Sequence, residues 1–185
     1  HGPVQESFQK LIETVSIELN SSTDNPLIFP TPENPGPHEV VSQGNFHAEV
    51  LALVADAMSL GLFELSSISE RRIDQMLDPA RRAIRPFLAE NPGLESGLMI
   101  VQYVAAASLG ELRGHANPRT AFSTTTSAGQ EDHVSMGATA SWNLLEAIQR
   151  CREVLACEAF VAHRAKQLIE RPSSTCVESL IRCMN

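Results

Sequence analysis

The sequence predicts an all-α protein built as a bundle of long helices. Apolar residues recur at steps of three and four along several stretches, which is the period of a helix that faces a core. No stretch of useful length alternates apolar and polar residues as a half-buried strand does. Residues 131–169 contain no proline and a single glycine, enough for one helix about 50 Å long. The 185 residues, 43% of them hydrophobic, suffice for a real core.

The first helix is expected over residues 3–20, with Pro3 in the first turn, where proline is tolerated. Its apolar positions share one face: Val4, Phe8, Leu11, Ile12, Val15 and Leu19. Turn-forming residues at 23–26 then lead to a short apolar run at 27–29. Residues 30–37 hold four prolines and one glycine, which predicts a surface loop.

The second helix is expected over residues 46–66, with Asn45 as its N-cap. This stretch is apolar on nearly every side, which predicts a central helix that neighbours surround. Ser67-Ile68-Ser69-Glu70 has the form of a capping box, so a separate shorter helix is expected from there to about residue 77.

Two further helices are expected in the second half of the chain. Residues 97–115 are apolar and small, and a loop rich in Thr and Ser follows at 118–129. The long helix over 131–169 then opens at Gln130-Glu131-Asp132-His133, with Ser127 and Gln130 as a capping box. We therefore assign residues 1–170 to a helical bundle segment and 171–185 to a polar C-terminal tail. Helices of this length favour association between subunits.

Charge and composition exclude several functional classes. The formal net charge is −8, so the chain repels nucleic-acid phosphates and anionic lipid. We find no run of about 18 uninterrupted apolar residues and no signal peptide, so we expect no membrane contact and a cytoplasmic protein. The four cysteines match no zinc-binding spacing and are expected to be reduced thiols, and no motif predicts a metal site.

Two segments could carry chemistry. Gln130-Glu131-Asp132-His133 places two carboxylates and an imidazole within one turn, where a carboxylate could accept a proton or hold a ligand that bears N–H groups. The structural alternative is an ordinary helix start, because acidic residues are favoured in a first turn. Gly44-Asn45-Phe46-His47 is likewise explained, taken alone, as a helix cap beside a buried Phe.

Read together, the segments resemble consecutive motifs of the histidine ammonia-lyase family, in the family's order and spacing. The resemblance covers residues 4–164. The matching motifs are Ser21-Ser22-Thr23-Asp24-Asn25-Pro26-Leu27, Gly44-Asn45-Phe46-His47, Ile68-Ser69-Glu70-Arg71-Arg72-Ile73, Ser96-Gly97-Leu98-Met99-Ile100 and Gln130-Glu131-Asp132-His133-Val134-Ser135-Met136-Gly137.

The resemblance implies a long-helix bundle like that of the fumarase/ammonia-lyase-like superfamily, assembled as a homotetramer. It also implies elimination of ammonia from an aromatic amino acid. The family's electrophile is 4-methylidene-imidazol-5-one (MIO), formed from an internal Ala-Ser-Gly that this chain lacks, since Ser127-Ala128-Gly129 has a different order. The chain thus resembles the C-terminal part of such an enzyme, needs an N-terminal portion as partner and is expected to be inactive alone.

Four residues match family positions at the substrate. Glu131, which is expected to be catalytic, corresponds to the carboxylate that faces the imidazole of histidine, with Gln130 beside it, and Phe46 lines the pocket. Met99 is expected to line the same pocket. A carboxylate pairs with an imidazole, whereas phenylalanine ammonia-lyases resemble Asn-Gln-Asp at this point. The expected reaction is therefore conversion of histidine to trans-urocanate and ammonia, a step of histidine metabolism.

Some positions depart from the family pattern. Glu95 adds a charge before Ser96-Gly97-Leu98-Met99, Arg113 replaces a usual Lys, Arg119-Thr120-Ala121-Phe122 replaces Ser-Val-Asp-Ser, and the loop at 30–37 is longer. These departures leave open a tyrosine or phenylalanine ammonia-lyase, an aminomutase, or a non-catalytic assembly or regulatory module. A lyase of the fumarase–aspartase type is disfavoured, because its Gly-Ser-Ser-x-Met-Pro loop is missing.

Overall fold

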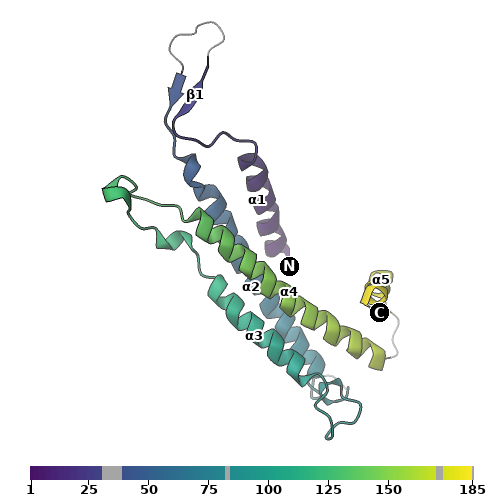
Figure 1. Cartoon of the computed structure of the whole chain (residues 1–185). Coiled ribbons are helices and arrows are strands. Elements are labelled where there is room, and N and C mark those ends of the chain that lie inside the picture. Colours follow the sequence, from purple (N-terminus) through teal and green to yellow (C-terminus); the bar gives the residue numbers. More distant parts are fainter. Residues whose placement is uncertain (31–38, 82–83, 170–172, 185) are drawn as a thin grey trace. The chain divides into compact units, whose positions relative to one another are not determined.

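The computed structural model describes residues 1–30, 39–81, 84–169 and 173–184 (Figure 1). Its helices are α1 (Gly2–Glu18), α2 (Glu49–Leu77), α3 (Met99–His115), α4 (Gly137–Leu168) and α5 (Thr175–Met184). The all-α prediction is confirmed. The chain forms two compact units: unit 1 is His1–Glu64 with Arg113–Ile148, and unit 2 is Leu65–Leu112 with Gln149–Asn185.

Unit 1 contains α1, a short hairpin and the parts of α2 and α4 that fall within its bounds (Figure 1). The apolar run predicted at 27–29 is strand β1 (Leu27–Phe29), which pairs antiparallel with β2 (Glu39–Val41). The loop prediction at 30–37 lies mostly outside the described residues. The buried core joins α2 to α4 through three alanines, which allow close packing, and two larger side chains, namely Ala52, Ala55 and Ala140 with Met58 and Leu144.

Helix α2 begins three residues later than predicted. Asn45 starts a 3₁₀ turn, η1 (Asn45–His47), and its side chain donates to Glu18 Oε2 at 3.0 Å instead of capping a helix. Ala48 then takes a left-handed conformation (φ 59°) that separates η1 from α2. The N-cap predicted at Asn45 is therefore wrong, because a tertiary partner engages the amide.

Unit 2 packs the remainder of α2 and α4 with most of α3 and the turn η2 (Pro86–Leu88). Its core draws on all of these elements: Ile73, Leu77, Leu88, Ala105, Val161 and Ala165. The helix predicted at 97–115 is confirmed as α3. The polar tail predicted beyond residue 170 contains helix α5, which the irregular pattern there did not indicate.

The break predicted inside α2 is absent, since the helix runs unbroken through residues 67–70. The side chains of the supposed capping box have other partners. Ser69 Oγ donates to Glu158 Oε2 at 2.5 Å, and Glu70 is paired with Arg71, whose Nε lies 2.6 Å from Glu70 Oε2. Ser69 and Glu70 thus bind other side chains, and neither caps the start of a helix.

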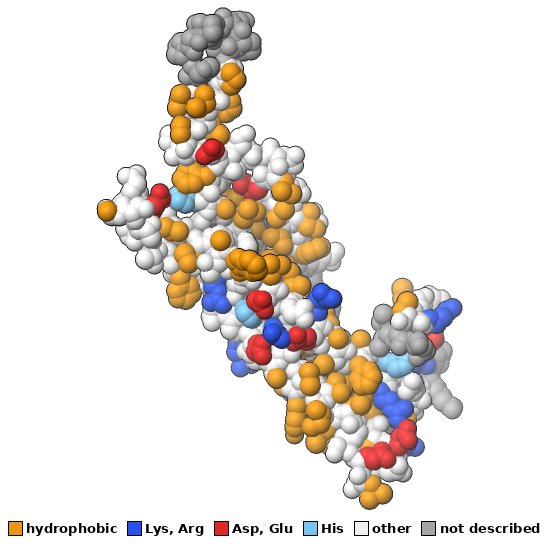
Figure 2. Space-filling view, viewed as in Figure 1, with side chains coloured by type: hydrophobic (Ala, Val, Ile, Leu, Met, Phe, Trp, Pro, Cys, Tyr) orange, Lys and Arg blue, Asp and Glu red, His pale blue; other side chains and the backbone are white. Residues whose placement is uncertain are grey.

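Helix α2 is less enclosed than its composition predicted. Several of its large apolar side chains are exposed, namely Val50, Leu53, Leu60 and Ile68. Similar side chains lie over much of the visible face in Figure 2. By length and composition α2 alone among the described helices could cross a membrane, a test that core helices of soluble proteins also pass. Its buried apolar residues belong to the two cores, so we interpret it as a core helix.

Helix α4 begins at Gly137, not at the predicted 131. Ser135 Oγ accepts the Gly137 N–H at 3.2 Å and provides the capping contact. The capping box predicted at Ser127 is wrong, because Ser127–Gly129 forms its own 3₁₀ turn, η4. Residues 130–136 therefore form a loop that precedes the helix, which changes how Glu131 is presented.

Within unit 2 the ion pair between Arg72 and Glu158 should make stability depend on acid pH. Burial opposes ionisation of Glu158, but hydrogen bonds from Arg72 and Ser69 and the charge of Arg72 outweigh it, so the net pKa lies below the usual 4.5. A carboxyl with a lowered pKa stabilises the folded state above its unfolded pKa, and that contribution disappears as pH falls through the folded pKa. We expect the unfolding free energy to decline below about pH 4.5.

Arg72→Met tests this coupling by urea unfolding at neutral and acid pH. We expect a loss of about 2 kcal/mol at pH 7 and a flatter decline in acid, since hydrogen bonds to charged groups contribute that much. Arg81→Met is the matched control, because its pair with Asp78 is exposed and 3.4 Å long and should contribute almost nothing. Equal acid slopes in the wild type and Arg72→Met would contradict the assignment.

Candidate active site

Glu131 is presented by a tight turn in unit 1. The Thr126 N–H donates to the Glu131 carbonyl at 2.9 Å, and the Glu131 N–H donates back to the Thr126 carbonyl at 3.3 Å. Between them Ser127 and Ala128 take left-handed conformations (φ 53° and 56°), which non-glycine residues adopt at a cost of about 1 kcal/mol or more each. The two backbone bonds hold this strained turn closed and fix the backbone from which Glu131 projects.

The carboxylate of Glu131 meets the imidazole of His47. Glu131 Oε2 lies 3.0 Å from His47 Nε2, and the two side chains are 35% and 29% exposed. The contact is defined by this distance, and it is an ion pair only when the ring is protonated. Within the described residues Glu131 Oε1 makes no hydrogen bond, so one oxygen of the carboxylate is held and the other is open.

The loop that carries Glu131 is fastened to the turn that carries His47. Ser135 Oγ donates to the His47 carbonyl, in a contact shorter than an ordinary hydrogen bond. Gly137 packs so closely on this turn that a Cβ there would lie 3.2 Å from Ala48 Cβ and 3.3 Å from the His47 carbonyl. The His47–Glu131 contact is therefore supported by backbone packing on both sides.

Phe46 lies against the same pair. Its ring centroid is 4.1 Å from that of His47 with the planes tilted by 36°, and the residue is 41% exposed. Phe46 also lines a cavity of about 210 Å³ between η1, α1 and the start of α2, where Asn45 donates to Glu18. Phe46 and Glu131, both predicted from sequence, thus both contact His47.

The other two predicted residues are not brought to this contact. Gln130 follows the turn η4 with its N–H donating to the Ser127 carbonyl at 3.1 Å, and its side chain is exposed without a hydrogen bond to any described residue. Met99 is the first residue of α3 and belongs to unit 2. Their places in a substrate pocket remain predictions.

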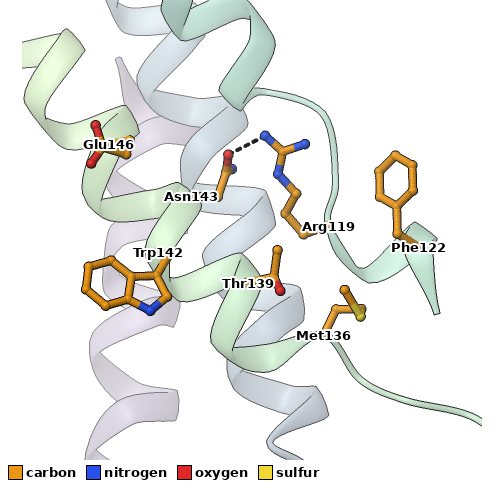
Figure 3. Close-up of a pocket in the computed structure, with 7 residues that line it drawn as sticks. All are labelled: Arg119, Phe122, Met136, Thr139, Trp142, Asn143 and Glu146. Carbon is orange, nitrogen blue, oxygen red and sulfur yellow. Dashed lines mark hydrogen bonds between the residues drawn. The ribbon is translucent and has the colours of Figure 1, made fainter. Parts of the chain in front are cut away.

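A second cavity of about 600 Å³ lies in unit 1 at the start of α4 (Figure 3). Its lining residues are Arg119, Phe122, Met136, Thr139, Trp142, Asn143 and Glu146. Arg119 Nη2 donates to Asn143 Oδ1 at 2.6 Å, while Asn143 Nδ2 donates to the His115 carbonyl at 2.7 Å. Sequence reasoning noted Arg119 only as a departure and gave no reason to join it to Asn143. Among the described residues, no three His, Cys, Asp or Glu side chains gather as a metal site would require.

Asp56 holds residues 119 and 120, which lead into the loop that carries Glu131. This residue of α2 is 8% exposed and accepts three hydrogen bonds of 2.9 Å, from the Arg119 N–H, the Thr120 N–H and the Thr120 hydroxyl. Asp56→Ala strands these donors, so we expect the unfolding free energy to fall by about 3 kcal/mol in urea unfolding. Glu64→Ala, on the exposed side of the same helix, should change it by less than about 0.5 kcal/mol. Similar losses in both variants would argue against this anchoring role.

Comparison with known proteins decides the family. The family model described as "Aromatic amino acid lyase" matches residues 1–184, almost the whole chain. The chain belongs to the aromatic amino acid lyase family. Its membership confirms the resemblance that the sequence motifs indicated.

Within the aromatic amino acid lyase family, several relatives are named histidine ammonia-lyase. The one from Bacillus mycoides (strain KBAB4) is 42% identical over 167 residues, which are 90% of this chain and 32% of that protein. The one from Bacillus cytotoxicus is 42% identical over 176 residues, covering 94% and 34%. The chain therefore spans about a third of the length of the curated relatives it matches.

Solved structures of aromatic amino acid lyases and aminomutases share the fold. The crystal structure of histidine ammonia-lyase from Trypanosoma cruzi matches with a TM-score of 0.90 and 35% identity, over 99% of this chain and 35% of that one. A tyrosine aminomutase also matches with a TM-score of 0.90, at 28% identity, over 98% and 34%. The helical arrangement is thus common to enzymes with different names, so the fold alone does not indicate the substrate.

Proposed function

We propose that this chain is a segment of an aromatic amino acid ammonia-lyase whose substrate is L-histidine and whose products are trans-urocanate and ammonia. One observation carries the proposal: Glu131 presents a carboxylate with one open oxygen beside the rings of Phe46 and His47. The 42% identity to relatives named histidine ammonia-lyase supports it.

The chemistry of Glu131 favours an imidazole substrate. A carboxylate oxygen accepts a hydrogen bond from an imidazole N–H and gains further from an imidazolium charge. A phenyl ring offers no such donor, so its binding leaves the carboxylate desolvated without a partner, which is costly. The exposed ring of Phe46 supplies an apolar surface near this acceptor. Gln130 and Met99 are proposed to complete the same pocket.

The electrophile is proposed to come from outside this chain. When present, the family's MIO group would supply an electrophile that draws electrons from the bound amino acid. This chain contains no Ala-Ser-Gly, and the strained Ser127–Gly129 turn has another order and serves to present Glu131. The residues here suit recognition of the substrate ring, and we expect the chain alone to be inactive and to require the N-terminal portion of the enzyme.

We also propose that the intact enzyme is a cytoplasmic homotetramer, as the resemblance implies. The described residues support an assembly because many large apolar side chains on the helices are exposed. Examples on three different helices are Phe8, Tyr103 and Trp142. The proposed N-terminal portion and neighbouring subunits would cover such surfaces.

The departure at Glu95 does not speak against this function. Its carboxylate accepts from the Asn91 side chain at 2.8 Å and from the backbone N–H groups of Asn91 and Glu90. The hydrogen bond from the Asn91 side chain is the main cause that lowers the pKa of Glu95. Glu95 is therefore occupied in closing its own loop, so it does not by itself favour the non-catalytic alternative.

The decisive experiment is to incubate the intact protein separately with L-histidine, L-tyrosine and L-phenylalanine and to quantify ammonia and the organic product. We expect rapid release of ammonia from histidine alone and a peptide in which Ala-Ser-Gly has lost the mass of two waters. Preference for tyrosine or phenylalanine, or formation of a β-amino acid, would replace histidine by the related lyase or aminomutase activities. An intact protein without the modified peptide and without turnover would favour the assembly module.

A further inference from the structure

We propose that His47 is a positioning residue that holds Glu131 in place and thereby determines selectivity for an imidazole over a phenyl side chain. The inference rests on the proposed function of Glu131 and adds a residue that the sequence motifs did not single out for this role. Its direct basis is the 3.0 Å contact between His47 Nε2 and Glu131 Oε2.

The contact is built into the backbone rather than formed by two mobile side chains. The Thr126–Glu131 bonds close one turn, and the left-handed Ala48 ends the other. Ser135 and Gly137 then join the two segments by a hydrogen bond to the His47 carbonyl and by close packing. The imidazole and the carboxylate are therefore brought together by the fold even though they lie far apart in the sequence.

A second contact also restricts the ring of His47. Phe46 packs on it at 4.1 Å between centroids, which limits the orientations that the imidazole can take. A ring held in one place keeps Nε2 beside Oε2, so the carboxylate has a partner at one position. Glu131 Oε1 is then left open at a defined position. An acceptor oriented in advance binds its partner without first having to be ordered.

This arrangement predicts selectivity and not only affinity. If His47 is lost, Glu131 keeps its charge but can turn toward solvent, so a ligand N–H no longer meets a placed acceptor. A phenyl side chain makes no bond to that acceptor and desolvates it when it binds, so its binding should stay the same or become tighter. The expected signature of a positioning residue is thus a loss confined to the substrate that bears N–H groups.

The test uses the intact enzyme with His47→Leu and His47→Gln. Leucine removes the donor, and we expect kcat/KM for L-histidine to fall about 30-fold, as small misplacements in an active site do. The inhibition constant of L-phenylalanine should not rise, since a phenyl ring makes no bond to the carboxylate and a Glu131 that can turn toward solvent lowers the desolvation cost of phenyl binding. Glutamine carries an N–H near the position of Nε2 and should restore kcat/KM to within about fivefold of wild type. His133→Leu, which removes an exposed imidazole two residues from Glu131, is the matched control and should not alter either constant.

Three results would overturn the proposal: unchanged kinetics of His47→Leu, equal losses for both amino acids, or a glutamine variant no better than leucine. In a Glu131→Gln background, His47→Leu should have little further effect. If the wild-type enzyme does not consume histidine, the proposed function fails, and ¹⁵N NMR of the chain judges the contact separately. The ring ¹⁵N signals of His47 should shift in Glu131→Ala and stay in place in Asp132→Asn; unchanged signals in Glu131→Ala would reject the contact itself.

Discussion

Glu131→Gln is expected to lower kcat/KM for L-histidine about 100-fold or more in the intact enzyme, within the range that one positioned acid–base or charge-bearing group contributes. Glutamine keeps the size of the side chain but replaces a charged acceptor by a neutral amide that is also a donor. An imidazolium or imidazole N–H at this point then loses its charge-assisted partner. The measurement is steady-state release of ammonia, with kcat and KM determined separately.

The neighbouring carboxylate provides the matched control. Asp132 is exposed, and among the described residues only its backbone carbonyl is bonded, to the Thr125 hydroxyl at 3.3 Å. Asp132→Asn removes the same charge one residue away and should leave kcat/KM within about twofold, because exposed charges contribute little. A comparable loss in both variants would show that net charge of the loop, rather than the placed carboxylate, matters. Unchanged turnover in Glu131→Gln would remove Glu131 from the site.

Periodicity predicted the helices well because each buries an apolar face. Helix α1 was expected over 3–20 and is Gly2–Glu18, and the helix expected at 97–115 is Met99–His115. The core residues Leu109 and Leu112 of α3 lie three apart, as one helix face requires. Such patterns can be recognised from neighbouring residues alone, because an apolar helix face can pack against any apolar surface.

Predicted helix starts were less accurate, because a polar side chain that could cap a helix can also form a hydrogen bond with a residue far away in the sequence. Ser69, Asn45 and Ser127 each stand where a capping residue is expected. Ser69 instead binds Glu158, Asn45 binds Glu18, and Ser127 enters a strained turn. The true start of α4 relies on Ser135, which simultaneously binds the His47 carbonyl.

The sequence predicted two residues of the candidate site but not how they are arranged. Glu131 and Phe46 were identified through family motifs, while the contact that joins them runs through His47. His47 stood in the Gly-Asn-Phe-His motif, and no local pattern paired it with position 131. The same holds for Asp56, whose role depends on backbone N–H groups at 119 and 120. Contacts of this kind depend on tertiary packing and produce no periodic pattern in the sequence.

Gly97→Ala is expected to destabilise the chain by about 3 kcal/mol or more, combining left-handed strain with a steric clash. Gly97 has φ 53°, and a Cβ there would lie 2.9 Å from the Ala89 N atom and closer still to the Phe87 carbonyl oxygen. Both obstacles are backbone atoms, which cannot move aside as a flexible side chain can. The Leu98 N–H also donates to the Phe87 carbonyl at 2.8 Å. Leu88, which lies between Phe87 and Ala89 in the sequence, is buried in the core of unit 2.

Urea unfolding of Gly97→Ala should be compared with Gly110→Ala, a glycine that lies within helix α3. No atom lies within 4 Å of a Cβ at Gly110, so alanine meets no obstacle there and improves helix propensity. The control should therefore gain about 0.5–1 kcal/mol, opposite in sign to the loss at Gly97. Because both changes add the same methyl group, a difference in sign isolates the backbone contact between Gly97 and the Phe87–Ala89 segment. Two variants of equal stability would mean that this segment does not rest on Gly97.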